Sequence, residues 1–538
     1  MTISNNDVLL VNRGSTSYKI KYENVKNDIT GDVDQFPEAP QDGNQYAREN
    51  GAWTQVTYTP AYTDSDVDTH LNTSTANANQ VLGWSGSDYE WKDAGTSGSG
   101  NPSLISYTFP SGQNRTLQSR LEDYVSIKDF GAVGCDPTDP NDTTDDTIAI
   151  RAALNAGHKG VYFPSGTYRV SETLDITGVT IFGDGMHSVI LYEPTVQTHI
   201  DNYCLRLTVN HTPYIANDGF EIRDIQVLKA ANNTSEGGIV IRDGGSGAIQ
   251  GPWTKVILDN ITIGAYYDQT LGTRGYFKKG LKIANVGGVY ASNITIANNI
   301  IGNHFDNSGG AREDPDAIGI YINSNKNRGS IRQLHLTNFY IQGFYRALWT
   351  TTNSTSSIES IYISQGEVKG REGFIFTGNT SATYLAGIHF DTWETAIGHF
   401  AAGGVHRVIG CDIRGDDEQS FSGYLVQLNS NQIVFANNFV SAGGANGTQG
   451  GLIACNTQLP NKAENITITN NIMQGAFRHN YPALLVQTGN KNVIFGANMF
   501  YCFVDNGADE NNLSVENKQP WYNLAGSELY IYGQRSYN

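Results

Sequence analysis

The sequence predicts an all-β protein whose larger part is a solenoid of parallel strands. Short segments that alternate apolar and polar residues recur every two to four dozen residues, and several contain an Asn-Asn pair. Alternation is the period of a strand with one buried face, and Asn tolerates the left-handed backbone of a sharp corner. A sandwich would alternate similarly without repeating this corner chemistry over so many copies. The segments are residues 257–264, 292–302, 333–341, 358–366, 387–394, 405–413, 432–440, 464–473 and 492–500.

The composition favours a β-rich, turn-dense protein of extracellular type. The chain has 538 residues, enough for two or three domains, with only 16% charged residues but 59 Gly and 29 Tyr. The net charge of −18 argues against nucleic acid and anionic membranes as partners, since both reward clustered Lys and Arg. A charged polysaccharide stays possible, because a local basic groove can exist in an acidic protein.

Neither a metal nor a cofactor is expected. The five cysteines are scattered, odd in number and never spaced as C-x-x-C, which favours small buried side chains over a metal or disulfide framework. No apolar run reaches the length of a membrane span, and residues 1–10 lack the pattern of a secretion signal. We therefore expect no membrane insertion and no secretion signal.

One helix is expected, between a strand at residues 125–130 and a strand that ends at Pro164. Thr143 or Thr144 can cap it, acidic residues 145–146 suit its first turn, and Gly157 ends it. Because a solenoid ends in unpaired strand edges, a helix with one apolar face can cover that end. The apolar stripe consists of Ile148, Ala149, Ala152, Ala153 and Ala156.

Three stretches carry a family resemblance. D-Y-V-S-I-K-D-F-G-A-V-G, T-D-D-T-I-A-I-R-A-A-L-N-A and V-Y-F-P-S-G-T-Y-R-V, within residues 123–170, resemble the start of bacteriophage tailspikes with a pectate-lyase-like right-handed β-helix. The resemblance implies a right-handed parallel β-helix with an N-terminal capping helix, a homotrimer, and a location on the phage tail. It also implies host cell-surface polysaccharide as the binding partner.

The N-terminal region extends this resemblance. Residues 8–23 predict a hairpin and resemble the start of virion-anchored tail fibre proteins of marine phages, and residues 41–56 and 79–93 resemble short modules of phage tail proteins. This implies attachment to tail, baseplate or adaptor proteins. The expected domains are a virion-attachment segment (1–34), small β modules with a linker (35–100), a neck (101–122), the β-helix (123–510) and a C-terminal tail (511–538).

Carboxylates on neighbouring coils are the candidates for chemistry. Asp391 and Glu394 flank an aromatic residue, and Glu367 precedes Glu394 by 27 residues, about one coil, so we expect both glutamates on one face. Glycoside hydrolysis needs one protonated and one ionised carboxyl beside the sugar, with an aromatic platform. The predicted catalytic residues are Glu367, Asp391 and Glu394, and the predicted substrate-binding residues are Trp393, Trp349, Asp412 and Arg371.

Several alternatives stay open. The chain could be a receptor-binding fibre without activity, or a polysaccharide lyase, which would need a base and a cation beside the sugar carboxylate. The available cations are Arg346, Lys369, Arg371 and Arg407. A free secreted enzyme is disfavoured by the missing secretion signal and the long N-terminal region. The acidic loop at residues 136–146 has the composition of a calcium site, but its prolines and missing central Gly break that pattern, and helix capping explains its acids better.

Overall fold

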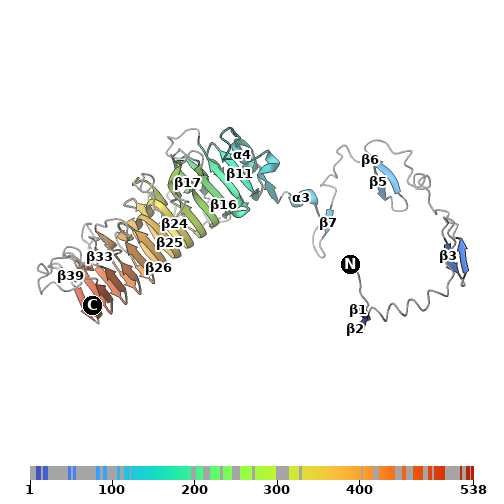
Figure 1. Ribbon diagram of the computed structural model, residues 1–538. Helices are drawn as coiled ribbons and strands as arrows, with labels where there is room; N and C mark the ends of the chain where they lie inside the picture. Colours follow the sequence, from blue (N-terminus) through green and yellow to red (C-terminus); the bar gives the residue numbers. More distant parts are fainter. Residues whose placement is uncertain are drawn as a thin grey trace. The chain divides into compact units, whose positions relative to one another are not determined.

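The chain divides into two units, residues 1–117 and 118–538 (Figure 1). The computed structural model describes residues 8–13, 16–21, 46–49, 52–55, 80–84, 89–93, 106–108, 114–121, 123–194, 202–209, 219–230, 234–244, 255–268, 273–298, 314–325, 330–401, 404–415, 423–442, 451–455, 464–475, 483–486, 490–502, 521–523, 529–532 and 535–537. Within these residues, no helix is long and apolar enough to cross a membrane.

The described residues of the first unit form four antiparallel strand pairs. They are β1 (Val8–Arg13) with β2 (Thr16–Lys21), β3 (Tyr46–Glu49) with β4 (Ala52–Gln55), β5 (Gln80–Trp84) with β6 (Tyr89–Asp93), and β7 (Ser106–Thr108) with β8 (Asn114–Thr116). The hairpin expected over residues 8–23 is β1–β2. The expected modules at residues 41–56 and 79–93 contain β3–β4 and β5–β6.

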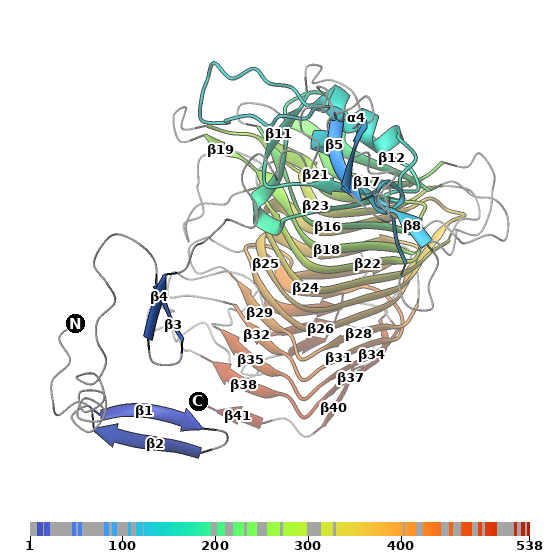
Figure 2. The ribbon, with the colours of Figure 1, turned by 90° about the vertical axis from the view of Figure 1, so that its right-hand side faces the viewer.

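The second unit winds through three parallel sheets, and each strand pairs with the corresponding strand of the next coil. Figure 2 shows β16, β18, β22 and β24 stacked in this way.

The first sheet runs through β9 (Tyr124–Ser126), β10 (Gly160–Phe163), β13 (Thr180–Gly183), the first parts of β16 (Phe220–Lys229), β18 (Val256–Ala265), β22 (Val289–Ala297), β24 (Ser330–Thr352), β25 (Ser357–Gly378) and β26 (Thr380–Thr392), then β28 (His406–Ile409), β31 (Ile433–Ala436), β34 (Glu464–Thr469), β37 (Lys491–Gly496) and β40 (Leu529–Tyr532).

The second sheet runs through β11 (Gly166–Val170), β14 (Ser188–Tyr192), later parts of β16, β18, β22, β24, β25 and β26, then β29 (Asp412–Gly415), β32 (Phe439–Ser441), β35 (Ile472–Gly475), β38 (Met499–Cys502) and β41 (Arg535–Tyr537).

The third sheet runs through β12 (Leu174–Ile176), β15 (Tyr203–Val209), β17 (Thr234–Asp243), β21 (Tyr276–Ala284), β23 (Ile318–Ser324), the last parts of β24 and β25, then β27 (Ile397–Ala401), β30 (Tyr424–Leu428), β33 (Gly451–Cys455), β36 (Leu484–Val486) and β39 (Trp521–Asn523). A small antiparallel pair, β19 (Tyr267–Asp268) and β20 (Thr273–Arg274), lies outside these sheets.

The core fills the inside of the solenoid, because alternate residues of every strand point inward. One inward row of the second sheet is at most 1% exposed and consists of Ile341, Val368, Phe390, Ile413, Val440 and Met473. An apolar side chain on one coil thus packs against an apolar side chain on the next coil, and the stacked coils bury a continuous core. The prediction of a parallel β-helix is confirmed.

Two of the three predicted Asn-Asn corners form as expected, at residues 437–438 and 470–471. In the third pair, Asn298 has no left-handed backbone, the left-handed residue of strand β22 is Asn293, and Asn299 lies outside the described residues. Asn437 and Asn470 adopt left-handed conformations, with φ of 57° and 56°. The next residue of each pair is buried. Asn438 Nδ2 donates to Asn471 Oδ1 (3.0 Å), and Asn471 Nδ2 donates to Asn498 Oδ1 (2.9 Å). The first asparagine makes the turn and the second joins a buried ladder along the solenoid axis.

The helix lies at the end of the solenoid where the chain enters it (Figure 1), but its boundaries and buried face differ from the prediction. It is α4 (Thr147–Asn155), with Asp146 rather than a threonine at the N-cap. Ile148 is 83% exposed, whereas Ile150, Ala153 and Leu154 belong to the core. The predicted stripe was therefore right only at Ala153, which belongs to the core, and Ala149, which packs against it. Ile148 was wrong, and Ile150 and Leu154 supply the large side chains of the buried face. A role against end-to-end association stays a prediction.

Two further predictions are corrected. In place of the strand expected at residues 125–130, the structure has the shorter strand β9 and then the 3-10 helix η2 (Ile127–Phe130). A capping box between Ser126 and Asp129 stabilises the start of η2. The described strands beyond residue 510, β39–β41, pair with β36–β38, so the solenoid continues past its expected end. The remaining helices are α3 (Leu117–Leu121) and the 3-10 turn η3 (Gly185–His187).

The cysteines are free thiols, as expected, where the structure describes them. Cys204, Cys411 and Cys455 are buried and Cys135 is half-buried. The side-chain burial of Cys502 lies outside the described residues.

Candidate active site

Most of the candidate residues fall into two groups, one on the second sheet and one beyond the corner that follows it. Glu367, Asp391 and Asp412 lie on the outer side of the second sheet, on three successive coils. Their backbones alternate with fully buried neighbours such as Val368 and Phe390, so the carboxylates point outward. The second group, Arg371, Glu394 and Trp349, lies beyond the next corner.

Two outward rows cross the second sheet beside each other. In the first row, successive coils place Tyr340, Glu367, His389 and Asp412 in register. In the second row they place Gln342, Lys369, Asp391 and Arg414 in register. Lys369, Asp391 and Arg414 therefore alternate in charge along the second row, and each acid of the first row stands beside a cation of the second.

The first row forms one wall of a groove of about 680 Å³. The groove lies at the corner between the first and second sheets, so it runs across successive coils. Tyr340, Glu367 and His389 supply its titratable groups. The other lining residues are Asn293, Ile294, Thr295, Asn338, Phe339, Gln365, Gly366 and Gly387.

Ion pairs hold these side chains in place. Lys369 Nζ lies 2.8 Å from Glu367 Oε1. His389 Nδ1 lies 3.1 Å from Asp412 Oδ2, and the guanidinium of Arg414 donates to both oxygens of Asp412, at 3.0 and 2.9 Å. Because the hydrogen bond to Glu367 favours the charged amine, the pKa of Lys369 is raised. Partial burial raises the pKa of Tyr340.

The register gives an approximate separation for two of the carboxylates. Glu367 and Asp391 are one strand and two residues apart, since Asp391 pairs with Lys369. With strands about 4.8 Å apart and a rise of about 3.3 Å per residue, their Cα atoms are about 8 Å apart. In inverting glycosidases the carboxyl groups themselves are about 6.5–9.5 Å apart, a spacing that two outward side chains at this Cα separation can reach.

The prediction that Glu367 and Glu394 stack on one face is wrong. The coil after Glu367 is shorter than the assumed 27 residues, so its neighbour is His389, and Glu394 aligns instead with Arg371. Arg371 Nε donates to Glu394 Oε1 at 2.8 Å. Glu394 therefore belongs to an ion pair outside the groove lining.

This second group is a stack of planar side chains. The ring of Tyr345 lies between the guanidinium groups of Arg371 (4.7 Å) and Arg346 (5.0 Å). Arg346 also lies 4.8 Å from the ring centroid of Trp349, and Tyr321 lies 5.5 Å from the same ring. Because neighbours already cover the Trp349 and Tyr345 rings, these aromatics do not offer the open platform expected for a sugar.

One carboxylate of this stack was missed from the sequence. Glu372 accepts a 2.6 Å hydrogen bond from Arg346 Nε, and burial raises its pKa despite that cation. Trp393 is half-buried, with its backbone amide bonded to Gly370 O at 3.3 Å, and does not line the groove. The pairing of Arg346 with Glu372 follows from coil register alone, which no local motif signals.

Comparison with known proteins assigns the family. The profile of the rhamnogalacturonase A/epimerase, pectate lyase-like family matches residues 124–398, just over half of the chain. This protein belongs to that family. The matched region includes the groove and the residues Glu367, His389 and Asp391, but ends before Asp412.

Individual relatives are more distant. Alginate lyase 7 of Azotobacter vinelandii is 42% identical over 78 residues, which are 12% of this chain and 8% of that enzyme. The chain therefore spans less than a tenth of the length of this curated relative.

Three solved structures are similar. The A-module of the A. vinelandii mannuronan C-5 epimerase AlgE6 has a TM-score of 0.41 at 16% identity, covering 77% of this chain and 99% of that one. The tailspike of E. coli bacteriophage HK620 with a pentasaccharide scores 0.42 at 12% identity, covering 82% and 70%. Tailspike protein 3 of bacteriophage CBA120 scores 0.40 at 13%, covering 89% and 70%. At these values, no function or site residue is transferred to this chain.

Several groove residues of this family member were not predicted. Tyr340 and His389 line the groove, and Lys369 pairs with one of its acids. The alternation in I-H-F-D, with His389 and Asp391 two residues apart, places both on the outer face once the strand is known. That signal was present, but the groove itself depends on which coils stand side by side.

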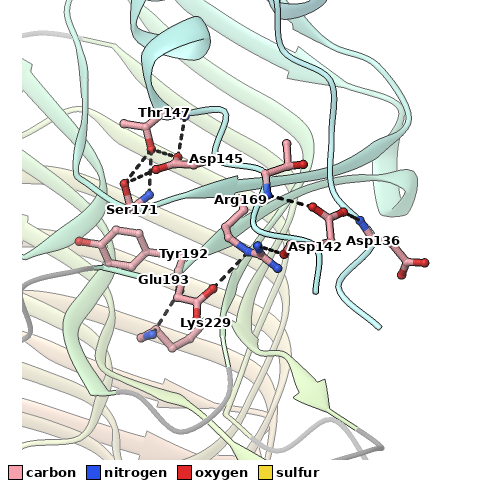
Figure 3. A network of polar contacts seen from close by, with 10 residues as sticks. Asp136, Asp142, Asp145, Thr147, Arg169, Ser171, Tyr192, Glu193 and Lys229 are labelled. Carbon is pink, nitrogen blue, oxygen red and sulfur yellow. Dashed lines mark hydrogen bonds and ion pairs between the residues drawn. The ribbon is translucent and has the colours of Figure 1, made fainter. Parts of the chain in front are cut away.

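The acidic loop before α4 uses its carboxylates internally (Figure 3). Asp142 accepts hydrogen bonds from the amides of Asp136 (2.6 Å) and Thr144 (2.9 Å). Asp145 bonds Thr147 N at 2.9 Å and also Ser171 Oγ. Asp142 therefore closes the loop, whereas Asp145 satisfies the amide of Thr147, the first residue of α4, as the explanation by helix capping expected. Among the described residues, no group of three or more His, Cys, Asp or Glu is placed to hold a metal ion.

Proposed function

We propose that this protein is a phage tailspike that binds a host surface polysaccharide in the groove and cleaves it by glycoside hydrolysis. The observation that carries the proposal is the groove itself, with Glu367 on its wall and Asp391 about 8 Å away on the next coil. Membership of a family described by rhamnogalacturonase and epimerase activities supports a carbohydrate substrate.

The proposed mechanism is a single displacement with inversion. Glu367, hydrogen-bonded to Lys369, is the ionised base that takes a proton from water, whose oxygen attacks the anomeric carbon. Asp391, in its protonated form, gives its proton to the departing glycosidic oxygen. The net result is addition of one water across the glycosidic bond.

The remaining parts of the proposal concern assembly. The N-terminal unit, with its four antiparallel pairs, would attach the protein to tail, baseplate or adaptor proteins, and the chain would act as a homotrimer at the host surface. Light scattering of the purified protein tests the trimer, which requires three times the chain mass of 58.6 kDa. A monomer mass would contradict this part alone.

Incubation of the purified protein with host envelope polysaccharide tests the activity. Glu367→Gln and Asp391→Asn should each lower the cleavage rate by at least about 10²-fold, as expected for loss of a general acid or base. Glu394→Gln is the matched control and should keep the rate, because Glu394 pairs with Arg371 beyond the next corner, away from the sheet face that carries Glu367 and Asp391. Full activity of the first two variants would refute the site, and binding without cleavage by the wild type would identify an adhesin.

A second candidate, polysaccharide lyase, is favoured by one observation. Tyr340 and His389, which can act as bases, share the groove wall, and Lys369 lies beside it as a cation. A lyase would release products with an unsaturated sugar end that absorbs ultraviolet light, whereas hydrolysis releases none. If the products are those of hydrolysis, nuclear magnetic resonance of the anomer that forms first distinguishes inversion from retention.

A further inference from the structure

One residue per coil makes the corner between the first and second sheets, and these residues form a column along the groove. All have φ between 49° and 67°. In order along the axis they are Asp224, Asn260, Asn293, Asn338, Gln365, Gly387, Gly410, Asn437, Asn470 and Ala497. This conformation favours Asn and Gly, and five of the ten corner residues are Asn and two are Gly.

At two consecutive coils the corner residue is glycine, so the column has no side chain there. Asn338 and Gln365 line the groove with exposed side chains, and Asn338 Nδ2 donates to Asn293 Oδ1 at 2.6 Å. At Gly387 and Gly410, by contrast, a Cβ would meet no heavy atom within 4 Å. Gly387 lines the groove, and Gly410 follows on the next coil just beyond the groove lining, so the outer surface is open over these two coils, about 10 Å of the axis.

The wall beside this opening is held rigidly. His389 lines the groove next to Gly387, and Asp412 stands beside Gly410 on the following coil. Asp412 accepts from both guanidinium donors of Arg414 and bonds His389 Nδ1. With Nδ1 engaged, His389 Nε2 has no partner among the described residues and is available to a ligand. Paired carboxylates of this kind fix the orientation of an imidazole.

We propose that Gly387 and Gly410 form the floor of a saccharide subsite, in which one sugar ring occupies the space of the two missing side chains. His389 Nε2 bonds a hydroxyl of that ring, and Asp412 and Arg414 are positioning residues. This rests on the proposed function, since it assumes that the groove takes a polysaccharide. The subsite adds one point to that function: the open space at this end of the groove, where two corner side chains are absent, decides which polysaccharide is bound.

The test fills the subsite without disturbing the fold. Gly387→Asn and Gly410→Asn introduce the residue that the same corner carries at Asn338 and Asn437, so both variants should melt close to the wild type. Ala497→Asn is the control, because it places Asn at the same type of corner three coils beyond Gly410, away from His389 and Asp412. Binding is measured by calorimetry in the Glu367→Gln background, with alginate, polygalacturonate and the host envelope polysaccharide as probes.

We expect Gly387→Asn and Gly410→Asn to weaken binding at least about tenfold, the loss of about one good contact, while Ala497→Asn binds like the unmodified background. Folded glycine variants that bind every probe as tightly as the background would overturn the subsite. Cleavage that depends on Glu367 together with unchanged binding would overturn the subsite alone. Weakened binding in a protein that cleaves nothing would overturn the hydrolysis and leave the subsite standing. If no probe binds the wild type, both proposals fall.

Discussion

Asn471 is the middle member of the buried asparagine ladder, and its replacement by Ala should destabilise the C-terminal coils strongly. Its Oδ1 accepts from the backbone amide of Asn438 (2.9 Å), and its Nδ2 donates to the carbonyl of Phe435 (3.1 Å). It also bonds the side chains of Asn438 and Asn498. Only 1% of Asn471 is exposed, so water cannot replace these partners.

The magnitude follows from the groups left without partners. In Asn471→Ala, the amide of Asn438 and the carbonyl of Phe435 lose the side-chain partner that the ladder gives them. A buried polar group left unsatisfied costs about 1–3 kcal/mol, so the variant should lose about 2–6 kcal/mol. Asn492→Gly is the control. It removes an exposed ladder bond to Asn465 at a left-handed corner, and should cost about 1 kcal/mol or less.

Hydrogen exchange resolves this effect locally, which matters because solenoids need not unfold in one step. The amide of Asn438 should exchange at least about 30-fold faster in Asn471→Ala, the equivalent of about 2 kcal/mol. Chemical denaturation of the full chain gives the overall loss. Exchange at Asn438 that is unchanged, or equal in the two variants, would refute the assignment of stability to the ladder.

Three further predictions concern other parts of the solenoid. Burial lowers the pKa of Lys229 to about 8, so the folded state binds fewer protons than the unfolded state up to the ordinary value of 10.5. Stability should therefore rise by about 3 kcal/mol as pH rises through that window, and Lys229→Met should abolish the rise in denaturation curves. Tyr345→Ala separates two guanidinium groups from their shared ring and should cost about 1–2 kcal/mol in denaturation, whereas Tyr345→Phe should cost less. Burial raises the pKa of Cys204 and Cys455, so a thiol reagent should label both only after unfolding, and a fast reaction in the native protein would contradict their burial.

The β-helix could be predicted because its signals are local. In Asn437-Asn438, the first residue adopts a left-handed backbone and the second bonds a buried partner. Asn suits both positions, so the sequence shows them as a repeated Asn-Asn pair. The alternation around each pair sets which residues face the core. The helix α4 shows the limit of such reasoning, since both of its faces carry apolar residues. Nothing local states that Ile150 rather than Ile148 turns inward.

The site could be predicted only in part, because it depends on register between coils. Glu367 and Asp391 were expected near one another and do share an outer face, but Glu394 was assigned to that face on an assumed coil length. Coil length varies with insertions, and the pairing also shifts between Gln342 and Phe344, where one strand carries an extra residue. A residue's neighbours across coils therefore change by several positions without any change in its own segment.

The same dependence explains why corners matter for function in this fold. The register of a strand is strongly constrained, because a shift by one residue would move every inward side chain to the outer face and every outward side chain to the core. A corner residue has one requirement, a left-handed backbone, which Asn and Gly both meet. The choice between Asn338 and Gly387 is thus nearly neutral for folding, and it decides whether the groove beside it is filled or open. Variation at corners can reshape the binding surface while the ladders that hold the solenoid stay unchanged.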